Sequence, residues 1–199
     1  MQTLNDKNNA IEWLLIDYEK DYTAQENRDK IKPLRQQLNS WSSDNIRRYI
    51  TKMPVGDFAY DMCDIYNDRY DDTKCFHVLA FEDGILVGTA IIANNSNDIK
   101  IEFNNYTLPN NLKILYLVIN PDYQNRGIGT RMIKSIIDNQ QFFSQSAKTS
   151  GISGEIHKDN IASQKAILKN HFEVYRPFTK NDDFSTYFYI DDKSNTPNL

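Results

Sequence analysis

Two closely spaced glycines, Gly127 and Gly129, stand between an apolar run and an amphipathic run that predicts a helix. Glycine adopts backbone angles closed to other residues and lets a ligand approach the main chain closely. The first amides of a helix have no partner within it, and together with the helix dipole they attract anions. Arg126, Arg131 and Lys134 add positive charge, although the chain has a net charge of −4. These residues predict a phosphate or pyrophosphate cradle where a strand turns into a helix.

Two common phosphate-binding motifs do not fit this segment. A P-loop requires Gly-Lys-Ser/Thr, whereas Gly129 is followed by Thr130 and Arg131. A dinucleotide-binding turn requires a third glycine at the position of Met132. It also usually follows the first strand of its domain, not a strand past the middle of the chain. The predicted cradle therefore favours another class of coenzyme site.

The segment resembles the coenzyme-binding turn of the GNAT family of acetyltransferases. The family signature, Q/R-x-x-G-x-G/A, matches Gln124-Asn-Arg-Gly127-Ile-Gly129, and the preceding Pro121 and Tyr123 fit as well. The resemblance continues at Asn160 and at a helix that ends in Lys169-Asn-His171-Phe172. Family members carry Lys-x-Gly-Phe at that helix end, so a histidine here replaces the glycine.

The resemblance covers residues 75–190 and implies an α/β (α+β) fold with a mixed, twisted central sheet flanked by helices. It also implies acetyl-CoA as co-substrate, without a metal. The main chain of Val118 and Ile119 would pair with the pantetheine arm. The pyrophosphate would lie on the cradle, which consists of Gln124, Asn125, Arg126, Gly127, Ile128, Gly129 and Thr130. Asn160 would contact the pantetheine, or it would serve only as the N-cap of the following helix.

The catalytic groups depart from the family pattern. Many members carry a tyrosine seven residues after the Asn as general acid, and here that position is Ile167. Many also carry a glutamate on the central strand, near the positions of Lys113 and Leu115. Amine acetylation needs a neutral amine, a stabilised oxyanion and a proton for the leaving thiolate. The sequence leaves the donor of that proton unassigned.

Other side chains are candidates for the catalytic acid or base. Glu155 and His157 alternate along a predicted strand and therefore share one face, and an imidazole titrates near neutral pH. Tyr116 lies on the central strand, where it would face the thioester or lie in the core. Glu102, in a short strand expected at 99–103 within an otherwise polar stretch, is a further carboxylate. Each of these residues also has a purely structural interpretation.

An acidic and aromatic segment, residues 57–72, bears on the acceptor. If it borders the acceptor pocket, Asp61 and Asp64 would attract a cationic amine. The alternative is a solvated helix face opposite the apolar side chains of the same segment. We expect a primary amine of a small molecule or a peptide as the acceptor, with its identity left open.

The elements that position these residues are predicted as helices first and strands later. A capping box from Thr23 to Glu26 and a cap at Ser43 predict two helices, residues 57–70 predict a third, and 11–18 fits a strand or a helix. From residue 75 a hairpin is expected to turn at 82–84. Strands are expected at 75–81, 85–93, 113–119, 152–157, 172–178 and 184–190, and helices at 128–137 and 160–170.

The whole chain of 199 residues fits a single domain. We expect a variable, mainly helical part (1–74), an acetyl-CoA-binding core (75–191) and a disordered tail (192–199). The chain lacks an apolar run long enough for a membrane and a secretory leader, and Cys63 and Cys75 fit reduced thiols, so we expect a cytoplasmic protein. The acidic balance does not favour nucleic-acid binding. Monomer and homodimer both stay open.

The sequence therefore favours an N-acetyltransferase that moves an acetyl group from acetyl-CoA to a primary amine. The rival hypothesis is a non-catalytic acyl-CoA-binding or regulatory domain that kept the cradle and lost the acid and base. Ile167, at the position of the family's tyrosine, is the main support for the rival.

Overall fold

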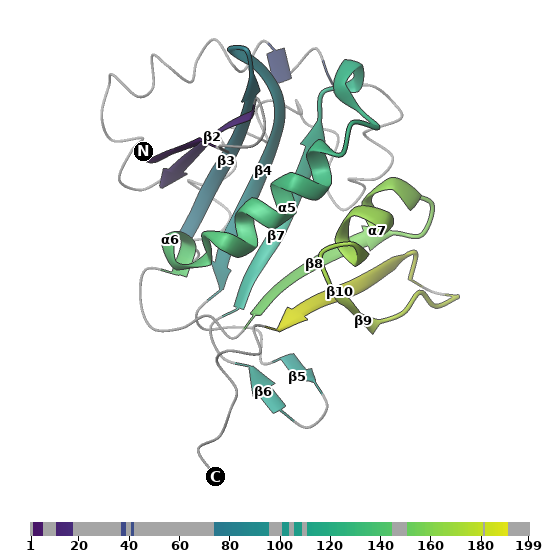
Figure 1. Cartoon of the computed structure of the whole chain (residues 1–199). Helices are drawn as coiled ribbons and strands as arrows, with labels where there is room; N and C mark the ends of the chain where they lie inside the picture. Colours follow the sequence, from purple (N-terminus) through teal and green to yellow (C-terminus); the bar gives the residue numbers. More distant parts are fainter. Residues whose placement is uncertain are drawn as a thin grey trace.

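The fold is built around one large, twisted sheet (Figure 1). The computed structural model describes residues 2–5, 11–17, 37–38, 41, 74–95, 101–103, 106–108, 111–144, 151–180 and 182–190. In their order across the sheet, the eight strands are β1 (Gln2–Asn5), β2 (Ile11–Asp17), β3 (Lys74–Glu82), β4 (Ile85–Asn95), β7 (Asn111–Ile119), β8 (Gly151–His157), β10 (Phe184–Ile190) and β9 (Glu173–Arg176). Two short strands, β5 (Ile101–Phe103) and β6 (Tyr106–Leu108), pair separately.

The large sheet is mixed, because β7 and β8 are parallel while the other neighbouring strands are antiparallel. A parallel connection needs a crossover, and here helix α5 (Ile128–Asp138) provides it. This arrangement confirms the predicted mixed central sheet flanked by helices.

The hairpin from β3 to β4 turns where the sequence predicted. Asp83 and Gly84 both have positive φ, at 51° and 77°, as a tight hairpin turn requires. The ambiguous segment 11–18 forms strand β2, which pairs along its whole length with β3. Its side chains alternate between the two faces of the sheet, so the strand interpretation holds.

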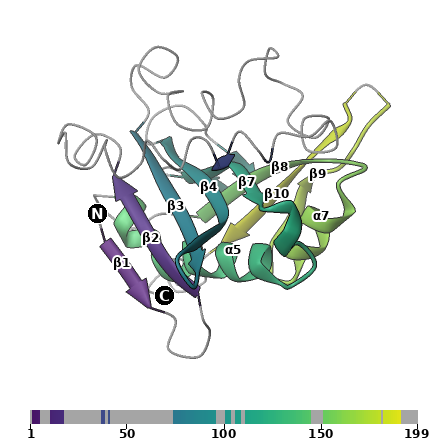
Figure 2. The same ribbon diagram turned by 90° about the horizontal axis from the view of Figure 1, so that it is seen from above.

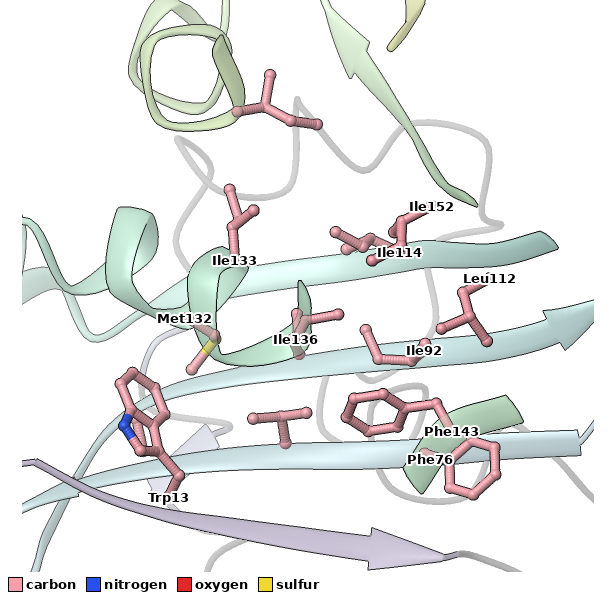
Figure 3. Close-up of a cluster of buried hydrophobic side chains, with 14 of the residues drawn as sticks. Trp13, Phe76, Ile92, Leu112, Ile114, Met132, Ile133, Ile136, Phe143 and Ile152 are labelled. Carbon is pink, nitrogen blue, oxygen red and sulfur yellow. The ribbon is translucent and has the colours of Figure 1, made fainter. Parts of the chain in front are cut away.

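The described helices that follow β7 cover one face of the sheet (Figure 1 and Figure 2). They are α5, α6 (Gln140–Ser144) and α7 (Ile161–Leu168). Helix α5 buries Ile128, Met132, Ile133 and Ile136 against that face, as predicted, and Ile137 is partly buried. Figure 3 shows Met132, Ile133 and Ile136 of this helix together with Trp13, Phe76, Ile92, Leu112 and Ile152 of the sheet. We call this cluster the first core.

A second core lies on the opposite face of the sheet. Ile16, Leu79, Ile91 and Val118 form its sheet side, and Leu38 and Trp41 pack on them. Strands β3 and β4, which contribute side chains to both cores, are therefore buried on both faces, which agrees with their nearly continuous apolar sequences. None of the helices in the described part of the chain is long and apolar enough to cross a membrane.

Some elements differ from the sequence predictions, and some predictions lie outside the described residues. Within the part expected to be mainly helical (1–74), the residues described at the start form strands β1 and β2, and β1 was not predicted. Helix α6 was not predicted either. The capping box at Thr23, most of the predicted helices up to residue 70, the acidic side chains of 57–72, Cys63 and the tail 192–199 lie outside the described residues.

Candidate functional site

A β-bulge in β7 determines which of its side chains face each core. Ile114 pairs with Ile92 and Tyr116 pairs with Ile91, so Leu115 is an extra residue without a counterpart on β4. The bulge shifts the alternation by one. Leu112 and Ile114 before it and Leu117 and Ile119 after it all contact the first core, whereas Tyr116 and Val118 contact the second.

Strands β7 and β8 separate halfway along. Their parallel pairing runs from Asn111 with Gly151 to Ile114 with Gly154, although the strands continue to Ile119 and His157. In the described structure β8 pairs with no residue of β7 beyond Ile114. The main chain of β7 from Leu115 to Ile119 therefore offers an edge to which an extended ligand can hydrogen-bond.

The turn after β7 is held by hydrogen bonds to the sheet. The N–H of Asn120 donates to the carbonyl of Val87 (2.9 Å), and its Oδ1 accepts the N–H of Asp122 (3.1 Å). Residues Pro121–Tyr123 form one turn of 3₁₀ helix. The side chain of Gln124 then donates back to the carbonyl of Ile119 (3.4 Å). These contacts set the start of the cradle relative to the edge of β7.

The cradle (residues 124–130) presents main-chain amides at the start of α5. Asn125 and Gly127 have positive φ, at 62° and 74°, and no side chain caps the helix. The first bond within α5 runs from the N–H of Arg131 to the carbonyl of Gly127 (3.1 Å). The amides of Ile128, Gly129 and Thr130 precede it, so they have no partner within the helix. Such a helix start suits a phosphate group.

The two glycines of the cradle have different requirements. Gly127 needs its positive φ, and a Cβ there would meet no atom within 4 Å. A Cβ on Gly129 would lie 3.6 Å from Ile119 and 3.7 Å from Leu117, which is ordinary contact. The backbone angle therefore accounts for Gly127, whereas packing alone does not require Gly129.

The basic side chains near the cradle are partly engaged elsewhere. Nη2 of Arg126 lies 3.0 and 2.8 Å from the carboxylate oxygens of Glu82, and the guanidinium lies 5.0 Å from the centroid of the Tyr123 ring. Lys134 pairs with Asp138, one turn further along α5. Arg126 thus lies beside the cradle with its orientation set by Glu82 and Tyr123, while Lys134 is drawn towards the other end of the helix.

Asn160 is the N-cap of helix α7, which packs against the point where β7 and β8 separate. Oδ1 of Asn160 accepts the N–H of Ser163 (3.2 Å), so the N-cap role is confirmed, while a contact with pantetheine stays a prediction. Ile167 is buried in the first core. Its Cδ1 would lie 3.4 Å from a Cβ built on Gly154, which also faces Ile114. An apolar side chain therefore occupies the position of the family's tyrosine.

Glu155, His157 and Tyr116 lie on the face of the sheet away from α5. Ile152 and Ile156 of β8 belong to the first core, so the alternating Glu155 and His157 point to the opposite side. Tyr116 is half-buried there against the second core. The fold brings the three candidates to one face. Glu102 lies in β5, but its side chain is outside the described part of the structure.

Glu155 and His157 have different surroundings. The carboxylate of Glu155 is partly exposed and lies 3.4 Å from Nζ of Lys113, beside the last pair of β7 with β8. Nδ1 of His157 accepts the N–H of Asp159 (3.2 Å), so a neutral ring carries its proton on Nε2. In that tautomer Nε2–H is a hydrogen-bond donor.

A charged pair lies next to His157 at the end of β8. Lys158 Nζ lies 2.6 Å from Oδ1 of Asp183, and this contact raises the pKa of Lys158 and lowers the pKa of Asp183. Oδ2 of Asp183 lies 4.0 Å from Nε2 of His157. Among the described residues, no group of three or more His, Cys, Asp or Glu side chains could hold a metal ion.

Comparison with known proteins identifies the family. The sequence model of the Acetyltransferase (GNAT) family matches residues 35–172, which is more than half of the chain. The chain belongs to this family. Membership supports acyl transfer as the general activity of this GNAT protein. A sequence comparison with curated proteins gave no match.

Solved structures share the GNAT fold at low sequence identity. An uncharacterised protein from Bacillus halodurans has a TM-score of 0.64 at 14% identity, over 95% of this chain and 89% of that chain. The GNAT domain of S. lividans PAT has 0.60 at 11%, over 91% and 90%. Spermidine N-acetyltransferase from Vibrio cholerae, in complex with CoA and spermine, has 0.57 at 15%, over 91% and 96%. At these identities the likeness shows the fold alone.

Two residues of this GNAT protein's site were not among the sequence predictions. Glu82 reaches Arg126 from 44 residues earlier in the chain, and Asn170 donates a hydrogen bond to Thr130 from 40 residues later. Both contacts join elements that are distant in sequence. The spacing of residues within one segment cannot predict these two contacts, because only the fold brings the partners together.

Proposed function

We propose that this protein is an N-acetyltransferase that transfers an acetyl group from acetyl-CoA to a primary amine. One observation carries the proposal: in the described part of the chain, the edge of β7 beyond Ile114, where β8 no longer pairs with it, runs directly into a turn whose amides have no partner within α5. In CoA an extended pantetheine arm is joined to a pyrophosphate. The arm would lie along the edge of β7, and the pyrophosphate would lie on the turn that follows it. Membership of the GNAT family supports the same ligand.

The residues of the site fit this ligand. The amides of Gly127 to Thr130 would hold the pyrophosphate, with Gln124, Asn125 and Arg126 bordering it. Gly127 leaves open space in front of the helix start, where a Cβ would meet no atom. The main chain of Val118 and Ile119 would pair with the pantetheine, and Asn160 at the start of α7 would border it. Bound acetyl-CoA would supply an activated acyl thioester.

The chain's own groups would then position the amine and move its proton. Main-chain N–H groups at the bulge of β7 can polarise a carbonyl oxygen held there. Glu155 is our first candidate for the group that attracts the amine and takes its proton, because its carboxylate is partly exposed on the face opposite α5. Lys113 fixes its orientation. His157 and Tyr116, on the same face, are candidates for donating a proton to the leaving thiolate.

The acceptor is proposed only as a class. A GNAT relative of the same fold has spermine in its structure, and spermine is a polyamine with primary amino groups. We propose a small-molecule or peptide amine in the cytoplasm, acetylated by a monomer or a homodimer. The acidic side chains of 57–72 that would attract such a cation lie outside the described residues.

A second candidate function is acyl-CoA binding without catalysis. The buried, apolar Ile167 at the position of the family's general acid favours it. The two functions differ in turnover. An enzyme releases the free thiol of CoA when a suitable amine is added, whereas a binding domain releases none at any amine concentration.

The proposal is tested first by thermal unfolding with and without acetyl-CoA. At 100 times its Kd the coenzyme should stabilise the native state by about 2.7 kcal/mol, which raises Tm by about 5–11 °C for a chain of this size. Gly127→Glu should abolish this rise, because it places a carboxylate at the helix start. Gly84→Glu is the matched control, since Gly84 also has a positive φ and open space.

A screen of amines for thiol release follows. Glu155→Gln should lower kcat by about 100-fold with the Kd for acetyl-CoA unchanged, because a positioned base contributes about that factor. A folded wild type whose Tm does not rise at millimolar acetyl-CoA would refute the proposed coenzyme. A rise in Tm without thiol release from any amine would favour the non-catalytic function.

A further inference from the structure

Asn170 links the end of α7 to the first turn of α5. Its side chain is buried, with only 5% exposed. Nδ2 donates one hydrogen bond to the carbonyl of Thr130 (3.0 Å) and another to the carbonyl of Ala166 (2.9 Å). Thr130 is the last residue of the cradle, and Ala166 belongs to α7. One amide nitrogen thus joins the cradle to a neighbouring helix.

The same helix contacts the place where β7 and β8 separate. Ile167 packs in the first core over Gly154, beside Ile114, the last residue of β7 that pairs with β8. Figure 1 shows α7 running beside α5 and above β8 and β10. Helix α7 therefore packs over the last pair of β7 with β8 through Ile167, and the residue Asn170 just after it reaches the cradle.

We infer that Asn170 is a positioning residue that aligns the cradle with the edge of β7 beyond its last pair with β8. The inference rests on the proposed function, in which one ligand occupies both places. Such a ligand binds with its full affinity only when the separation and orientation of the two places match those of its two halves. Asn170 fixes that separation by holding the start of α5 against α7.

An asparagine suits this role because its amide carries two N–H donors on one nitrogen. A leucine at position 170 keeps the same number of side-chain heavy atoms and the same branching at Cγ but donates to neither carbonyl. A serine is smaller and offers one donor on a shorter side chain. In both variants each half of the site keeps its own groups, and only the connection between the halves is weakened.

The experiment compares the Kd of CoA with the Kd of ADP, which carries a pyrophosphate without the pantetheine arm. Both are measured by calorimetry on folded wild type, Asn170→Leu and Asn170→Ser. We expect the Kd of CoA to rise about tenfold in both variants, while the Kd of ADP changes less than twofold. A residue that only stabilises the fold would leave the ratio of the Kd of CoA to the Kd of ADP unchanged.

Asn94→Leu is the matched control. Nδ2 of Asn94 also donates to two carbonyls, those of Phe143 (3.1 Å) and Ser144 (2.9 Å), but it joins β4 to α6 away from the cradle. This variant should keep the wild-type ratio. The inference is wrong if CoA binds both Asn170 variants as tightly as wild type, or if CoA and ADP weaken by the same factor. Failure of wild type to bind CoA would overturn the proposed function itself.

Discussion

Arg126 borders the cradle with its guanidinium partly committed to Glu82. The contact uses Nη2, so Nε and Nη1 keep their donors, and the side chain is 49% exposed. Tyr123 supports the guanidinium from the other side. This arrangement holds a positive charge beside the proposed pyrophosphate without requiring the arginine to leave its carboxylate partner.

Replacing Arg126 should therefore weaken coenzyme binding moderately. We expect Arg126→Gln to raise the Kd of CoA about fivefold, because an exposed charge pair contributes about 1 kcal/mol. The salt dependence of binding should fall as well, since exposed charges are screened by salt. Glu82→Gln is the companion variant and should bind CoA at least as tightly as wild type. Weaker binding by Glu82→Gln than by Arg126→Gln would contradict this account.

Tyr187 makes stability depend on pH in the alkaline range. Burial in the first core raises the pKa of its phenol above the ordinary value of 10.0. The folded state therefore keeps this proton when the unfolded state loses it, and stability falls as pH rises above about 10. Below that pH the contribution is complete. Urea unfolding of wild type and Tyr187→Phe between pH 8 and 11 should show a shallower alkaline decline in the variant. Parallel curves would argue against this assignment.

At the scale of elements, β8 requires a glycine where it meets β10. Gly151 pairs with Ile190, and a Cβ there would collide with the carbonyl oxygen of Tyr189 and lie 2.6 Å from the ring of Phe188. We expect Gly151→Ala to lower the free energy of unfolding by about 2–3 kcal/mol, as overpacking does. Gly154→Ala on the same strand meets only ordinary contacts and should cost less than about 1 kcal/mol. Equal losses in urea unfolding would rule out steric collision as the cause.

The elements that the sequence predicted correctly are those with a strong local pattern. The hairpin from β3 to β4 and the succession of β7, cradle and α5 follow from apolar periodicity and turn residues. Strand β1 was missed because its four residues, QTLN, show no apolar alternation, and α6 because five residues are too few for helical periodicity. His171, which replaces the family's glycine, adopts a φ of 63°, in the left-handed region that favours glycine.

The candidate site was predictable only in its local part. The glycines, the turn and the cap at Asn160 lie in continuous segments of sequence. The pairing of Val118 and Ile119 with pantetheine was implied by the family resemblance, but the bulge at Leu115 depends on pairing with β4, which the residues of β7 alone do not reveal. Likewise, the partners of Arg126 and Thr130 come from distant strands and helices.

At the scale of the molecule, the large sheet consists of two parts joined by a short connection. One part contains β1, β2, β3, β4 and β7, and the other contains β8, β10 and β9. Strands β7 and β8 pair through four residues, from Asn111 to Ile114, whereas β3 and β4 pair along nearly their whole length. The proposed coenzyme would lie along this connection.

The short connection has a consequence for how the native molecule opens. Amide hydrogen exchange should divide the strands into two cooperative units, with β8 and β10 exchanging together and faster than β3 and β4. Acetyl-CoA should slow exchange in the faster unit most, because a ligand that binds across the connection opposes its opening. Mass spectrometry of exchanged peptides would resolve the units, and one common rate with and without the coenzyme would contradict them. With its coenzyme bound, the protein would open locally less often. The coenzyme would then hold the two parts of the sheet together where strand pairing does not.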